Sequence, residues 1–311
     1  MAIERACMRA VCKPWGSIDL RPWSEIHDEG GAIGELWFQR SDEDAPNSEL
    51  LLKLLFTNAP LSIQVHPGDV FARSIGLARG KSEAWYVLSA RPGAEVAVGL
   101  KYSVTAVQLR AAIDDGSISD LVQWHGVEKG DVIFVPAGTI HAIGAGLVIA
   151  EIQQLSDATF RIFDHGRDRE LQVDHAVAVA NAGPAEHRFV PVAIGPARTL
   201  LVANPHFVLE RIDLSAKSNW ELRAERETWL LILEGYARVG LMNAFVGEAT
   251  YFDGDRTTIT AGSDGMTALV AYLGPEPRFG LLRSLDSQSV DFPFHDYAPT
   301  KTLHRLTAAR A

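Results

Sequence analysis

Residues 61–67 of this chain read Leu-Ser-Ile-Gln-Val-His-Pro. In a strand, alternation with period two places Ser62, Gln64 and His66 on one face and the apolar side chains on the other. Short runs of this kind, bounded by Gly, Pro, Asn and Asp, recur along the chain and are typical of antiparallel sheets rather than parallel α/β folds. The sequence therefore predicts a mainly β protein.

The predicted strands fall into two groups, separated by an Ala-, Gly- and Pro-rich stretch at residues 181–197 that suits a connection between two units. The first group comprises residues 34–39, 50–57, 61–65, 84–89, 95–100, 132–135, 147–153 and 159–164, with short helical insertions at 105–113, 118–124 and 173–180. The second comprises residues 207–214, 220–223, 228–234, 236–241, 248–252, 257–260 and 267–272. We expect two β-barrels in series, spanning residues 1–185 and 196–311.

Composition and charge exclude several classes of function. Lys and Arg total 29 against 39 Asp and Glu among 311 residues, a net charge of −10 that repels polyanions and argues against a nucleic-acid partner. The longest apolar runs are far shorter than the ~20 residues that cross a membrane, and the first residues lack the layout of a signal peptide. We expect a cytoplasmic protein.

Four polar residues in separate strand signals are candidate metal ligands. Gln64 and His66 share one strand face, Glu83 stands at the entrance of an apolar strand, and His141 follows a Pro-Ala-Gly-Thr turn. Each has an ordinary structural reading: a half-exposed edge strand, a solvated charge pair or a core histidine. Together, two imidazoles, one carboxylate and one amide oxygen suit a catalytic divalent ion. With Zn²⁺, this set keeps a net charge of about +1, so the ion remains a strong Lewis acid.

These residues lie in stretches that closely resemble type I mannose-6-phosphate isomerases, in particular their short bacterial form. The resemblance rests on LLKLLFTNAPLSIQVHPGD (51–69), GKSEAWYVL (80–88) and GDVIFVPAGTIHAIGAGLVIAEIQQLSDATFRIFDHGR (130–167), supported by KPWG (13–16) and GELW (34–37). It is dense from about residue 13 to residue 167 and looser beyond.

The resemblance implies cupin-like barrels (jelly rolls) and reversible interconversion of mannose 6-phosphate and fructose 6-phosphate. It implies one catalytic zinc per chain, with other divalent metals possible, held by Gln64, His66, Glu83 and His141. It also implies a substrate pocket that contains Lys53, Lys81 and Arg161, with Ser62 linked to phosphate binding. Larger family members have His before the lysine where this chain has Gly80, so no role of that His transfers.

Isomerisation moves a proton between C1 and C2 through an enediol and therefore needs an acid-base group. Glu151 and Lys81 are the candidates, with Arg161 as an electrostatic partner. Glu151 lies in an apolar strand where burial would raise its pKa, but it could equally form a structural ion pair with a lysine.

Lys53 stands inside the apolar run of residues 50–56. At a sheet edge it would extend to the surface, whereas in a central strand its ammonium needs an anionic partner. We predict that the partner is the substrate phosphate, with Lys81 or Arg161 assisting.

Two other functions compete: isomerisation of an unphosphorylated sugar, and sugar binding without catalysis. The second barrel has no His between residues 207 and 272 and is expected to be metal-free. Glu227 and Glu234 are interpreted as surface or loop residues.

Overall fold

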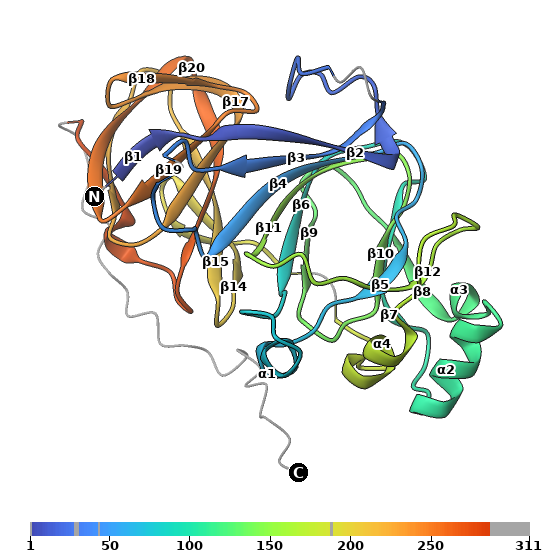
Figure 1. The fold of residues 1–311 in the computed structure, drawn as a ribbon. Helices are drawn as coiled ribbons and strands as arrows, with labels where there is room; N and C mark the ends of the chain where they lie inside the picture. Colours follow the sequence, from blue (N-terminus) through green and yellow to red (C-terminus); the bar gives the residue numbers. More distant parts are fainter. Residues whose placement is uncertain (1, 28–30, 43, 187–188, 287–311) are drawn as a thin grey trace.

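The computed structural model describes residues 2–27, 31–42, 44–186 and 189–286. Strands dominate these residues and the helices are short, which confirms the prediction of a mainly β protein (Figure 1). No helix within the described ranges is long and apolar enough to cross a membrane.

The first half of the chain forms two antiparallel sheets. The six-stranded sheet has the order β2 (Cys7–Ser17), β3 (Ile33–Gln39), β4 (Leu50–Thr57), β11 (Leu147–Gln154), β6 (Glu83–Ala90) and β9 (Val132–Val135). The five-stranded sheet has the order β12 (Phe160–Phe163), β5 (Ile63–Val65), β10 (His141–Ile143), β7 (Glu95–Leu100) and β8 (Val122–Gly126). The helices belong to this half: α1 (Asp69–Ser74), α2 (Ala106–Asp114), α3 (Ile118–Leu121) and α4 (Val173–Val179).

The second half forms one ten-stranded sheet, which the first strand of the chain joins. Its main order is β1 (Ala2–Arg5), β19 (Ala249–Asp253), β17 (Thr228–Val239), β20 (Asp255–Leu273), β15 (Phe207–Leu214), β14 (Arg198–Ala203) and β13 (Val192–Gly195). Off this order lie β16 (Asn219–Ala224), β18 (Met242–Phe245) and β21 (Leu282–Ser284), and a 3₁₀ turn, Phe279–Leu281, precedes β21. Within the described residues the pairing gives three open sheets rather than closed barrels.

The central strands of the six-stranded sheet, such as β4 and β11, are buried on both faces, which explains the unbroken apolar run of β4. Leu52 and Leu54 pack in the core shared with the second half, against residues such as Trp229. Leu55, from the opposite face of β4, packs instead in a core that faces the five-stranded sheet. Because side chains alternate along a strand, Lys53 points to the same side as Leu55. The lysine is therefore directed between the two sheets of the first half.

Several local predictions differ from the structure. The segments predicted as separate strands at 228–234 and 236–241 form one strand, β17, because Gly235 adopts a φ of 72° and the strand bends there without a turn. In the same way, β20 joins the strands predicted at 257–260 and 267–272. The helix predicted at 118–124 ends at Leu121, and the predicted connection contains β13.

Glu227, interpreted from the sequence as a surface or loop residue, lies in the loop before β17 but is not at the surface, since only 5% of it is exposed. Its carboxylate accepts hydrogen bonds from the backbone N–H groups of Glu49 and Leu50 (2.5 and 2.9 Å) and from the Trp229 indole (3.0 Å). It therefore ties the start of β17 to the start of β4. Glu234, in contrast, is exposed and pairs with Lys129.

Candidate active site

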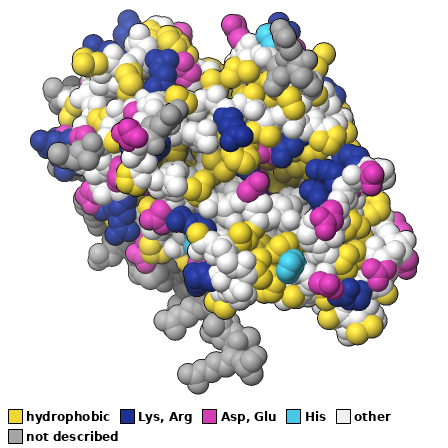
Figure 2. All heavy atoms as spheres, viewed as in Figure 1, with side chains coloured by type: hydrophobic (Ala, Val, Ile, Leu, Met, Phe, Trp, Pro, Cys, Tyr) yellow, Lys and Arg dark blue, Asp and Glu magenta, His cyan; other side chains and the backbone are white. Residues whose placement is uncertain are grey.

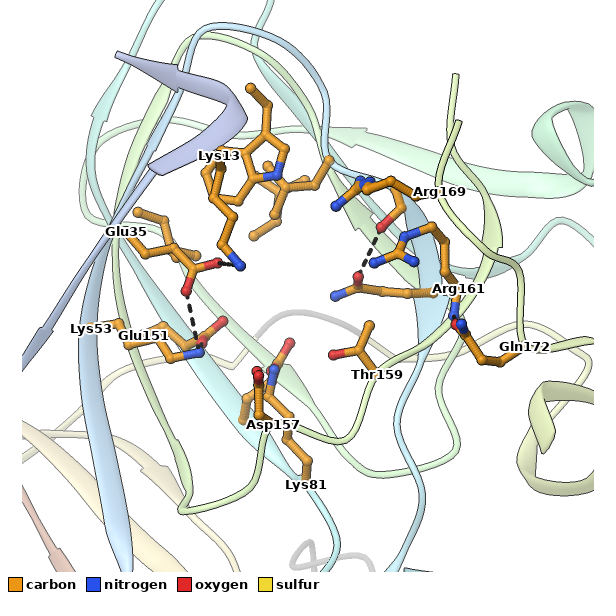
Figure 3. Close-up of a pocket in the computed structure, with 17 residues that line it drawn as sticks. Lys13, Glu35, Lys53, Lys81, Glu151, Asp157, Thr159, Arg161, Arg169 and Gln172 are labelled. Atoms are coloured by element: carbon orange, nitrogen blue, oxygen red, sulfur yellow. Dashed lines mark hydrogen bonds and ion pairs between the residues drawn. The ribbon is translucent and has the colours of Figure 1, made fainter. Parts of the chain in front are cut away.

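A cavity of about 240 Å³ lies in the first half. The face shown in Figure 2 is hollowed in its right half, where Lys and Arg side chains gather. In the close-up, Lys13, Glu35, Lys53 and Glu151 lie on one side of the cavity, and Arg161 and Arg169 lie on the other (Figure 3). The cavity thus presents charged groups from opposite sides to anything that enters it.

Two imidazoles and a carboxylate converge beside this cavity. His66 follows β5, Glu83 begins β6 and His141 begins β10, and each of the three is 1% exposed. One ligand atom from each lies within 4.8 Å of the others. The Nε2 atoms of His66 and His141 are each 3.4 Å from an oxygen of Glu83. Residues distant in sequence therefore form one compact cluster.

The donor set fits a divalent metal ion. The Nδ1 atoms of His66 and His141 lie 2.8 Å from the carbonyl oxygens of Ala158 and Thr139, which assigns the proton to Nδ1 and leaves Nε2 as a lone-pair donor. His66 Nε2 and Glu83 Oε1 are buried without a hydrogen-bond partner, while Glu83 Oε2 pairs with the Lys81 ammonium at 2.9 Å. Buried polar atoms in native proteins almost always have a partner, and a cation would supply it here.

Gln64 lies directly opposite His141 in the pairing of β5 with β10. Its Nε2 is 3.3 Å from His141 Nε2, and its Oε1 accepts a hydrogen bond of 3.0 Å from the Ser62 hydroxyl. The amide therefore turns its nitrogen toward the cluster, and a flip of its end group would turn the oxygen there. Ser62, which lines the cavity, is engaged with Gln64.

Lys81 and Glu83 form the closest ion pair of the cluster, at 2.9 Å. Burial alone would raise the pKa of Glu83, but the Lys81 ammonium and the two imidazoles hold it well below its usual range. For His66 burial has the opposite effect, because it disfavours the charged imidazolium, and it lowers the pKa to about 3. The cluster thus holds an ionised carboxylate and a neutral His66, the forms that bind metals.

Lys53 lies in a central strand and has carboxylate partners within the protein. Its Nζ is 3.7 Å from Glu35 and 3.5 Å from Glu151, and it stands 4.6 Å from the centre of the Trp37 ring. Lys13 extends the chain of charges, with its Nζ 3.3 Å from Glu35. The anionic partner expected for Lys53 is thus present before any substrate binds.

Glu151 faces the cavity from β11, next to Lys53 in the pairing with β4. Its second oxygen is 3.2 Å from the Trp85 indole nitrogen. Burial, reinforced by the charge of Glu83, raises the pKa of Glu151, although Lys81 and Lys53 oppose the shift. Glu151 therefore fits both interpretations from the sequence, since it forms an ion pair with a lysine and its carboxyl has a raised pKa.

Arg161 faces Gln64 across the pairing of β12 with β5. Its guanidinium donates to the Glu170 carbonyl (2.8 Å), and its Nε is buried without a partner. Within the described residues it makes no ion pair, whereas Arg169 binds Asp164 through two hydrogen bonds of 2.6 and 2.5 Å. Arg161 is therefore the cavity arginine whose charge is not already neutralised.

Sequence reasoning assigned no role to several residues that line the cavity, among them the charged residues Lys13, Glu35 and Arg169. Glu35 had a usable signal, because it is the only charged residue in the apolar strand β3, the same signal that drew attention to Lys53. Lys13 had a similar signal, since Val11 and Cys12 precede it and Pro14 and Trp15 follow it. Arg169 lies among charged and polar neighbours, so it carries no signal of this kind.

No protein-family model matches the chain. It is similar to a mannose-6-phosphate isomerase of Streptococcus mutans, with 36% identity over 200 residues, 61% of this chain and 62% of that protein. The chain thus aligns with about three-fifths of that relative's length. It is also similar to the probable mannose-6-phosphate isomerase GmuF of Bacillus subtilis, with 30% identity over 226 residues, 68% of this chain and 70% of that protein.

Solved structures share the fold. A mannose 6-phosphate isomerase from Bacillus subtilis superimposes with a TM-score of 0.77 at 22% identity, covering 88% of this chain and all of that one. A zinc-bound mannose 6-phosphate isomerase superimposes with a TM-score of 0.68 at 16% identity, with the same coverage of 88% and 100%.

Proposed function

The chain belongs to the mannose-6-phosphate isomerase family, and we propose that it reversibly interconverts mannose 6-phosphate and fructose 6-phosphate. The observation that carries the proposal is the cluster of His66, Glu83 and His141 beside a cavity that Lys and Arg side chains line together with carboxylates. A small anionic sugar matches a cavity of this kind, and the buried cluster of metal ligands beside it would hold a divalent ion that acts as the electrophile in aldose-ketose isomerisation.

The proposed ion is Zn²⁺, held by His66, Glu83 and His141, with Gln64 as the fourth ligand once its amide oxygen turns inward. Nitrogen donors with one carboxylate suit zinc, although other divalent ions accept the same set. When bound, the ion would polarise the sugar carbonyl and stabilise the charge that develops at O1 and O2.

We assign the remaining steps to side chains that line the cavity. Glu151 would take the proton from C2 of open-chain mannose 6-phosphate and return a proton to C1, while a proton passes between O2 and O1. Lys53 and the Trp85 indole hold its carboxylate in place, which supports this assignment. Lys81 remains the second candidate for proton transfer, and Arg161 would stabilise the enediol electrostatically.

For the phosphate we retain Lys53, Ser62 and Lys81 as the proposed binding residues. The contacts favour a larger share for Arg161, because Lys53 is already neutralised by two carboxylates. Arg161 makes no ion pair within the described part of the chain and so offers its full charge to an incoming dianion.

We also propose the finer architecture that the sequence suggested. The six- and five-stranded sheets would be the two faces of a cupin-like jelly roll with the metal cluster between them, and the ten-stranded sheet would be a second, metal-free one. The units would be residues 1–185 and 196–311, of which residues 287–311 lie outside the described part of the chain. The pairing of β1 with β19 links the first unit to the second. A cytoplasmic location remains part of the proposal.

Metal analysis combined with turnover tests the function. The purified protein should contain one zinc per chain and should lose turnover of mannose 6-phosphate on chelation, with recovery when zinc is restored. His141→Ala should lose both metal and turnover, whereas Arg161→Ala should keep metal and lose turnover. Turnover that persists in the metal-free protein would overturn the proposed site.

Substrate comparison separates the competing functions. Faster turnover of mannose than of mannose 6-phosphate would favour an isomerase of unphosphorylated sugars. Binding of mannose 6-phosphate in D₂O without deuterium entering the sugar at C1 or C2 would favour a non-catalytic sugar-binding protein.

A further inference from the structure

A second cavity, of about 1180 Å³, opens between the two halves of the molecule. Asp69 and Gln154 line it on the side of the first half, and His206 and Arg226 line it on the side of the second. Neither Asp69 nor Gln154 lines the cavity of the candidate active site. Their side chains nevertheless reach the segment that carries Lys81.

Three consecutive backbone amides around Lys81 are each held by a hydrogen bond. The N–H of Gly80 donates to Asp69 Oδ1 (2.8 Å), and the N–H of Ser82 donates to Gln154 Oε1 (3.0 Å). Between them, the N–H of Lys81 donates to the Pro67 carbonyl (2.9 Å). Gln154 Nε2 in turn donates to Asp69 Oδ1 (3.1 Å), so the two side chains form one connected pair.

Asp69 and Gln154 hold a part of the backbone that the hydrogen bonds of the sheet do not hold. Strand β6 begins at Glu83, so the strand ladder with β9 and β11 holds Glu83 but not Lys81. Burial raises the pKa of Asp69, but donation from Gly80 and Gln154 outweighs it and lowers the pKa, which makes Asp69 a charged acceptor. Hydrogen bonds to a charged acceptor are stronger than neutral ones.

We propose that Asp69 and Gln154 are positioning residues for Lys81. Acting from the cavity between the halves, they fix the backbone on both sides of Lys81 and so aim its ammonium into the active site. The inference rests on the proposed function, since it treats Lys81 as part of the isomerase site. The backbone of Glu83 does not depend on the pair, because the ladder of β6 with β9 and β11 holds it independently.

Hydrogen exchange and kinetics test the proposal together on the zinc-loaded protein. In Asp69→Ala and Gln154→Leu, the amides of residues 80–82 should exchange at least about tenfold faster. Turnover number for mannose 6-phosphate should fall about tenfold or more, because small displacements of a catalytic group are costly. The Michaelis constant should rise as well, because Lys81 is also a proposed phosphate-binding residue, and zinc content should stay at the wild-type value.

Two further variants control for general effects of substitution. Asp69→Asn keeps an acceptor oxygen for Gly80 and Gln154 but removes its charge, so its exchange and turnover should lie between those of wild type and those of Asp69→Ala. Asp253→Ala removes another carboxylate that lines the same cavity and should change neither. If Asp69→Ala does not fold, Gln154→Leu and Asp69→Asn still decide the question.

Unchanged exchange at residues 80–82 in Asp69→Ala would overturn the proposal, and so would faster exchange with wild-type turnover. Loss of zinc together with turnover would overturn it too, because the effect would then act through the metal cluster. A wild-type protein that does not turn over mannose 6-phosphate would refute the proposed function instead, and the exchange data would still show whether Asp69 and Gln154 hold the Lys81 segment.

Discussion

Gly80→Ala tests whether the segment before Lys81 has room for any side chain. A Cβ atom at Gly80 would lie 2.5 Å from the Pro67 carbonyl oxygen, 2.6 Å from the carbonyl carbon of Gly68 and 2.7 Å from the Asp69 nitrogen. These are backbone atoms, so no rotamer change relieves the overlap. Gly80 is not in the left-handed region, so the expected effect is steric alone.

The size of the effect follows from the overlap. Ordinary van der Waals contact begins near 3.4 Å, so the shortest of these distances falls short by about 0.9 Å. The segments that must separate carry His66 on one side and Lys81 with Glu83 on the other. Because a misplacement of about 1 Å costs roughly 10²-fold in rate, we expect turnover to fall about 10- to 100-fold. Overpacking should lower the free energy of unfolding by about 1–3 kcal/mol.

Gly68→Ala is the matched control, since it lies in the facing turn. A Cβ there would have only one neighbour within 4 Å, the Ala137 Cβ at 3.9 Å, so we expect turnover and stability close to wild type. Turnover is measured with mannose 6-phosphate and stability by urea denaturation. If Gly80→Ala behaved like Gly68→Ala, the close approach of the two segments would not constrain the site, and the steric explanation for the glycine would be wrong.

Three further predictions concern charges. Lys53→Met should lower the free energy of unfolding by about 3 kcal/mol, because it removes the ammonium that two buried carboxylates share, and should raise the Michaelis constant for mannose 6-phosphate. An unchanged constant would remove Lys53 from the phosphate site. Arg198→Met removes the partner of the fully buried Glu210 and should lower the free energy of unfolding, measured by urea denaturation, by about 3–5 kcal/mol, with turnover at 25 °C unchanged. Adding Glu210→Leu should recover most of this loss, and no recovery would contradict a buried ion pair. Burial raises the pKa of Asp164, but Arg169 and Arg167 outweigh it and lower the pKa. The contribution of ionised Asp164 to folding stability is therefore fully present above the unfolded pKa of about 3.9 and disappears as pH falls through the lower folded value. Asp164→Asn should therefore cost about 2 kcal/mol at pH 7 and progressively less below pH 4, and a difference from wild type that does not shrink in acid would contradict this assignment.

Much of the fold could be predicted because its signals are local. The predicted bounds of the strands at 50–57, 95–100, 132–135 and 207–214 match the structure. Predictions failed where long-range pairing overrode the local signal. At Gly235 the glycine suggested a turn, but pairing with β20 on both sides keeps β17 continuous.

The proximity of His66, Glu83 and His141 could also be predicted, because their residue types suit one metal site. Imidazole, carboxylate and amide groups in predicted strands indicate a metal site without any knowledge of distances. Which carboxylate pairs with which lysine or arginine could not be predicted. The sequence predicts the substrate phosphate as the partner of Lys53, whereas in the structure Glu35 and Glu151 lie beside it, on the strands paired to either side of β4.

The sequence by itself determined which side chains share a strand face and which of them can bind a cation, since both follow from alternation and side-chain chemistry. Only the tertiary structure decided which charges neutralise one another, and that the segment around Lys81 is held by Asp69 and Gln154. Ion pairs and hydrogen bonds depend on separations of a few ångströms between strands far apart in sequence, and those separations are set by sheet register and packing of the whole molecule.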